Sequence, residues 1–145
     1  MLFGQDRNQL RQMYFQAWGK ARHKQALSPL EEMVVNVITM HPEYHPILED
    51  EHIALHQDYF PELGETNPFL HMGMHIALHE QVATDRPAGI RDLARQFLQT
   101  FKESHAAEHQ MIEALAETLW SAQQNNEPPN EQNYLQQLRE LLKAP

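Results

Sequence analysis

Histidines recur four residues apart in this chain, and that spacing constrains the fold more than any other feature of the sequence. An α-helix places residues i and i+4 on the same face, one turn apart. Helices use this arrangement to present two imidazoles to one metal ion. The spacing therefore predicts a helical chain and, within it, a metal site. The pairs are His41/His45, His52/His56, His71/His75 with His79 four residues further on, and His105/His109.

Capping residues and prolines divide the chain into helical segments of ordinary length. Ser28 followed by Pro29 and Glu31 is a capping box that begins one helix, and Asn67-Pro68 begins another. No segment has the alternation of a strand, so we expect an all-α helical bundle, with a four-helix core and additional short helices, in a single His-rich domain over residues 1–145. The predicted helices are residues 6–22, 28–40, 46–59, 67–84, 90–101, 105–124 and 130–142, with Asp6 and Ser104 as further caps.

The composition limits which partners the chain can bind and which side chains can donate to a metal ion. The formal charge is -9 and no block of basic residues is present, so we expect no nucleic-acid partner. No apolar stretch approaches bilayer length and the N-terminus lacks a signal pattern, which predicts a cytoplasmic protein without a membrane partner. Cysteine is absent, so imidazole and carboxylate must supply any ligands. Such donors suit a divalent ion of iron, zinc, nickel, copper or manganese.

The helix that begins near Ser104 directs two histidines and a carboxylate into the interior. His105, Glu108 and His109 fall on the same helical face as the apolar Ile112 and Leu115. Burying a polar group without a partner costs several kcal/mol, about 2–7 depending on the reference state. These three side chains are therefore expected to contact one common polar or charged partner inside the protein.

The helix after Asn67 is apolar on nearly every side, so it should lie at the centre of the bundle and pack against the helix after Ser104. His71, His75 and His79 form one stripe along it. Three imidazoles in line can serve one metal ion or two, with His79 as a third ligand or as a partner of a ligand.

Two other pairs are weaker candidates. His52 and His56 share a predicted stripe with apolar residues, and Glu49 precedes His52 by three positions, as in ferritin-like helices that bind di-iron centres. Prolines interrupt the helix that would align His41 with His45, so a role in a capped turn is favoured for that pair.

These observations predict a metal-binding protein with a His/Glu site between helices. We expect the ring nitrogens of two pairs to converge on one ion, with a nearby carboxylate and one further histidine completing or flanking the site. A small-molecule ligand or substrate is compatible with such a site, whereas catalysis, the identity of the metal and any oligomeric partner do not follow from the sequence. The alternative is a structural or interaction module whose packed core histidines respond to pH. The expected ligands are His71, His75, His105 and His109 with Glu108, then His52, His56 and His79.

The sequence also resembles a proteobacterial family of small proteins known as domain of unknown function 1841. The resemblance extends over most of the chain, and it implies a bacterial cytoplasmic protein without implying an activity. The stretches that carry it are residues 4–7, 14–15, 17–18, 41–45, 66–75 and 81–87; the most specific is Thr66-Asn67-Pro68-Phe69-Leu70-His71-Met72-Gly73-Met74-His75.

Overall fold

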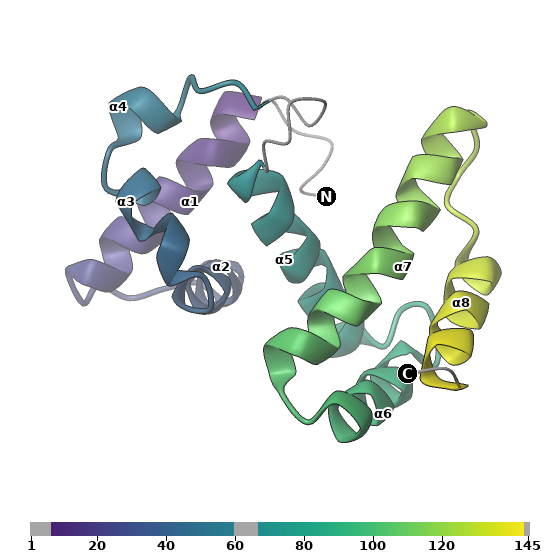
Figure 1. Cartoon of the computed structure of the whole chain (residues 1–145). Helices are drawn as coiled ribbons and strands as arrows, with labels where there is room; N and C mark the ends of the chain where they lie inside the picture. The colour runs from purple at the N-terminus through teal and green to yellow at the C-terminus, as the bar shows by residue number, and fades with distance from the viewer. Residues whose placement is uncertain (1–6, 60–66, 144–145) are drawn as a thin grey trace. The chain divides into compact units, whose positions relative to one another are not determined.

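The computed structural model describes residues 7–59 and 67–143 (Figure 1). All regular structure in these two ranges is helical, and no strand occurs within them. The predicted all-α helical-bundle class is therefore confirmed, whereas the predicted cap Asp6 lies outside the described residues. None of the described helices is long and apolar enough to cross a lipid bilayer.

The chain divides into two compact units, Met1–Ile76 and Ala77–Pro145. The boundary falls inside helix α5 (Pro68–Thr84), so one continuous helix contributes its first turns to one unit and its last turns to the other. The single domain over residues 1–145 stays a prediction.

The first unit begins with a capping box that confirms the start of its second helix. Ser28 Oγ accepts a hydrogen bond from the Glu31 backbone N–H at 3.2 Å, and the Glu31 carboxylate accepts one from the Ser28 N–H at 2.9 Å. The helix ends where Pro42 was expected to end it. In chain order the unit contains α1 (Arg7–Arg22), α2 (Pro29–Thr39), the 3₁₀ turn η2 (Pro42–Tyr44), α3 (His45–Leu48), α4 (Glu51–Ala54) and the first turns of α5.

The single helix predicted over residues 46–59 is wrong, because the chain forms two short helices there, α3 and α4. A tertiary contact explains why α4 ends so early. The guanidinium of Arg11 on α1 donates hydrogen bonds to the carbonyls of Ala54, Leu55 and Gln57 at 3.1, 3.2 and 2.7 Å. These carbonyls are thus satisfied by a buried side chain instead of by another helical turn.

Aromatic contacts join α1 to the start of α5. The Tyr14 hydroxyl donates to the Phe69 carbonyl at 3.2 Å, and the two rings meet edge to face at 5.5 Å. Arg11 lies over the same Phe69 ring at 4.8 Å. Burial raises the pKa of the Tyr14 phenol, so this donor stays protonated. These contacts position the first turn of α5, two residues before His71.

α5 itself begins and ends where the sequence predicts. The Asn67 side chain accepts hydrogen bonds from the N–H groups of Phe69 and Leu70 at 3.0 and 3.2 Å, which caps the helix. All side chains over residues 72–76 are buried, although these positions cover every face of the helix. Such burial is what the apolar circumference of this helix predicted, and its place at the centre of the bundle stays a prediction.

The second unit packs the last turns of α5 with three further helices. α6 packs against both α7 and α8, and α7 packs against α8, as the green and yellow helices of Figure 1 show. The Tyr134 hydroxyl ties α8 to α5 by donating to Gln81 Oε1 at 2.8 Å. Ser104 was expected to cap α7, but it is the first helical residue, and Glu103 occupies the cap position without a side-chain bond. The helices are α6 (Ile90–Phe101), α7 (Ser104–Gln124) and α8 (Glu131–Lys143).

Arg11 offers a direct test of this packing. Arg11→Met keeps a long apolar stem but leaves three carbonyls without their donor, so we expect the free energy of unfolding to fall by about 2–3 kcal/mol. Arg22→Met, at the exposed end of the same helix, should change it by less than about 0.5 kcal/mol. Urea unfolding followed by circular dichroism measures both, and equal effects of the two substitutions would contradict the anchoring role of Arg11.

Candidate metal centre

Three imidazoles of the first unit lie against one another. The ring centroids of His41 and His75 are 4.7 Å apart, those of His71 and His75 are 4.9 Å apart, and those of His41 and His71 are 5.0 Å apart. Each ring offers one nitrogen, and those three atoms lie within 4.8 Å of one another. His41 and His75 are buried and His71 is half-buried. This histidine triad, His41, His71 and His75, has the donor type and the spacing of a metal site.

The local sequence explains how each ring reaches the triad. His71 and His75 are one turn apart on α5, so both project from the same face. His41 directly follows α2 and its C-cap Met40, and it continues the buried stripe that includes Val37 and Ile38. Pro42 then starts η2 and takes the chain away, which leaves the His41 side chain facing inward.

The environment of His41 selects one nitrogen for coordination. Its Nδ1 is 2.8 Å from the Val37 carbonyl, and a carbonyl only accepts, so Nδ1–H is the donor. In the neutral ring Nε2 then carries the lone pair that a metal requires. The Tyr44 ring stacks on His41 at 5.4 Å and restricts its orientation. Backbone carbonyls orient metal-binding histidines in the same way in many known sites.

His45 has the capping role that the sequence analysis favoured for both members of its pair. Its Nε2 donates to the Ile38 carbonyl near the end of α2 at 2.9 Å, and its ring packs on Trp18 at 4.7 Å. A side chain that satisfies a terminal carbonyl stabilises the end of a helix. His41 fits the same interpretation, because its Nδ1–H donates to the Val37 carbonyl in the last turn of α2, and its ring is in addition part of the triad.

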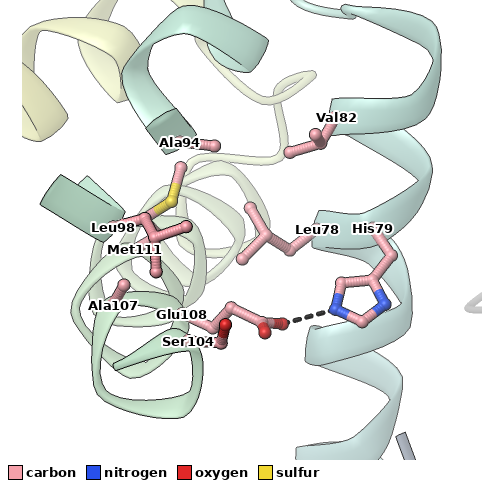
Figure 2. Close-up of a pocket in the computed structure, with 9 residues that line it drawn as sticks. All are labelled: Leu78, His79, Val82, Ala94, Leu98, Ser104, Ala107, Glu108 and Met111. Carbon is pink, nitrogen blue, oxygen red and sulfur yellow. Dashed lines mark hydrogen bonds and ion pairs between the residues drawn. The ribbon is translucent and has the colours of Figure 1, made fainter. Parts of the chain in front are cut away.

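The second unit holds a pair of imidazoles and a hydrogen-bonded His–Glu contact. The rings of His105 and His109, one turn apart on α7, are 4.2 Å apart, and each offers a nitrogen within 4.8 Å of the other. Glu108 lies between them in the sequence. Its Oε1 accepts a hydrogen bond from Nε2 of His79 on α5 at 2.5 Å. The dashed line in Figure 2 marks this contact.

A cavity of about 250 Å³ adjoins the His79–Glu108 contact. Figure 2 shows that side chains from α5, α6 and α7 surround it, with His79, Glu108 and Ser104 as the polar part of the wall. The apolar part of the wall comprises Leu78, Val82, Ala94, Leu98, Ala107 and Met111.

The described residues thus contain histidines that could hold a metal ion. His41, His71 and His75 form the triad of the first unit, and His105 and His109 form the pair of the second unit. Four of these five residues were predicted as ligands from their spacing; that the two pairs share one ion stays a prediction. His41 was missed because Pro42 was expected to misalign it; its place on the apolar stripe of α2 was the signal that could have identified it.

The remaining predicted ligands lie outside this group. His52 and His56 were expected to face inward, and that expectation is wrong, since both are exposed. The break between α3 and α4 separates Glu49 from His52, and His56 follows the end of α4, so no helix aligns these side chains. His79 and Glu108 form a hydrogen bond with each other. His79 was expected to be either a third ligand or a partner of a ligand, and its contact with the predicted ligand Glu108 corresponds to the second role.

The fold and the clustered imidazoles define a histidine-rich helical protein with a candidate metal centre. The chain belongs to the family described as Domain of unknown function (DUF1841), which matches residues 6–140. This match confirms the family that the sequence resembles, and the family description states no activity. No curated protein and no solved structure gave a significant match to the chain.

The hydrogen bonds predict opposite tautomers for two neighbouring histidines. In the metal-free protein, neutral His41 should carry its proton on Nδ1 and neutral His45 on Nε2, because each donates to a carbonyl. Long-range ¹H–¹⁵N spectra distinguish the two forms. His23 is a control, since its Nδ1 contacts the Gly19 carbonyl at an exposed position where water competes. An Nε2–H form of His41 would contradict the assignment of Nε2 as the metal-binding atom.

Proposed function

We propose that this protein binds one divalent transition-metal ion through the imidazoles of the triad His41, His71 and His75. The single observation that carries the proposal is the triad itself, in which two rings are buried and three nitrogens lie within 4.8 Å of one another. Three imidazole nitrogens at that spacing can coordinate one cation together, and three protein ligands are the usual number at a zinc site that keeps a position open.

The donor set narrows the choice of metal. All three proposed ligands are imidazoles, which suit iron, zinc, nickel or copper better than manganese, an ion that prefers oxygen donors. The Val37 carbonyl accepts a hydrogen bond from His41 Nδ1–H and so orients one of the three rings. Partners of this kind orient ligands and raise metal affinity.

Three further expectations belong to the proposal. The protein is bacterial and cytoplasmic, as the family resemblance implies, and its formal charge of -9 disfavours a nucleic-acid partner. A divalent cation is also the kind of ligand that an acidic chain attracts electrostatically.

Metal affinity in variants tests the triad. The wild-type protein, purified without a histidine tag and titrated with zinc against a chromophoric chelator, should bind one ion per chain. Loss of a partner of a ligand costs about 10–100-fold in affinity, so loss of a ligand should cost at least about 100-fold. We expect this loss for His75→Ala and for His71→Ala. The second variant is the more informative, because His71 is only half-buried and its replacement should disturb folding less.

Two histidines provide matched controls. His45→Ala removes the histidine that directly follows η2, and His23→Ala removes an exposed one; neither should change zinc affinity. Unchanged zinc affinity in both His71→Ala and His75→Ala would contradict the triad as the site. No bound ion in the wild type would favour the alternative in which the histidines serve packing.

A further inference from the structure

The cavity in the second unit has a composition that a binding site for a small organic molecule requires. Its volume is about 250 Å³, and aliphatic side chains from α5, α6 and α7 form most of its wall (Figure 2). Ligand sites are mostly apolar and carry a few polar groups that orient the ligand. The small side chains of Ala94 and Ala107 leave this space between the helices. Leu98 is 45% exposed, so one edge of the cavity reaches the surface and admits a ligand.

The polar groups of the wall are gathered at one side and are mostly acceptors. Glu108 contributes a carboxylate whose side chain is only 16% exposed, and His79 donates to one of its oxygens. An ionised carboxylate has two oxygens and about four lone-pair sites, so a bonded partner does not by itself prevent it from accepting a hydrogen bond from a ligand. Ser104 adds a hydroxyl to the lining. A ligand that enters the cavity therefore meets a negative, hydrogen-bond-accepting group at one point only.

We propose that this cavity binds a small neutral molecule with an apolar body and one hydroxyl group, which donates to the Glu108 carboxylate. An anionic ligand is disfavoured by repulsion from Glu108. A cationic ligand would be attracted to Glu108, but it would lose its hydration on entering a largely aliphatic wall, which costs more than placing a neutral donor there. A hydroxyl donates to the carboxylate without that cost.

The volume limits the size of the ligand. A cavity of about 150 Å³ lined by aliphatic side chains accommodates benzene, so about 250 Å³ accommodates a molecule of about ten non-hydrogen atoms. Phenols and short-chain alcohols meet both requirements. The cavity residues all lie in the second unit, and none of them is a proposed metal ligand, so the inference stands independently of the metal proposal.

Binding of phenol to the full chain tests the inference. The protein is first freed of metal with a chelator, so that coordination of phenol to an ion is excluded. Phenol, toluene and benzoate are then titrated separately and followed by ¹H–¹⁵N NMR. We expect phenol to shift the amide signals of residues around the cavity and to bind at least about tenfold more tightly than toluene, while benzoate should not bind.

Two alanine substitutions localise the site. Ala94→Phe fills the cavity from a half-buried position, and it should weaken phenol binding at least about tenfold. Ala116→Phe introduces the same ring at an exposed position of α7 and should leave phenol binding unchanged. Zinc stoichiometry should be unaffected in both variants, which separates the cavity from the metal site.

The opposite results overturn the proposal. Unchanged phenol binding in Ala94→Phe would place the ligand elsewhere, and equal affinities for phenol and toluene would remove the role of Glu108. Absence of phenol binding at millimolar concentrations would show that the cavity takes no ligand of this class.

Discussion

The burial of imidazoles along α5 is the constraint on which the rest of the structure depends. This helix carries a histidine on each of three successive turns, and its central residues 72–76 are buried on every side. Buried polar rings require polar partners. His79 contacts Glu108, and His71 and His75 lie against a third imidazole, His41. The turn after α2 positions that third ring, and the aromatic contacts at the start of α5 position the helix that carries the other two.

Much of the helical architecture could be predicted because its signals are local. The capping box of Ser28 and Glu31 and the Asn67 cap depend on residues within one turn of the helix that they begin. The failures depend on residues distant in the sequence. α4 ends where Arg11, more than forty residues earlier in the chain, takes its carbonyls, and no local pattern indicates that contact.

The candidate site also contains residues that local spacing predicts and one residue that it does not. The four-residue spacing predicted His71, His75, His105 and His109, because helix periodicity alone places each pair on one face. His41 enters the triad through a helix end. That position depends on where Pro42 redirects the chain, and periodicity does not describe it. His52 and His56 have the correct spacing but no helix to align them, so spacing indicates a site only where a helix continues.

The central claim is that the triad His41, His71 and His75 binds one metal ion. X-ray absorption spectroscopy of the zinc-loaded protein measures it most directly, because outer-shell scattering from imidazole rings counts the histidines bound to the metal. We expect at least three imidazoles at zinc–nitrogen distances of about 2.0–2.1 Å, and the His71→Ala variant should lose one of them. Two imidazoles or fewer in the wild type, or an unchanged count in the variant, would contradict the triad as the metal site.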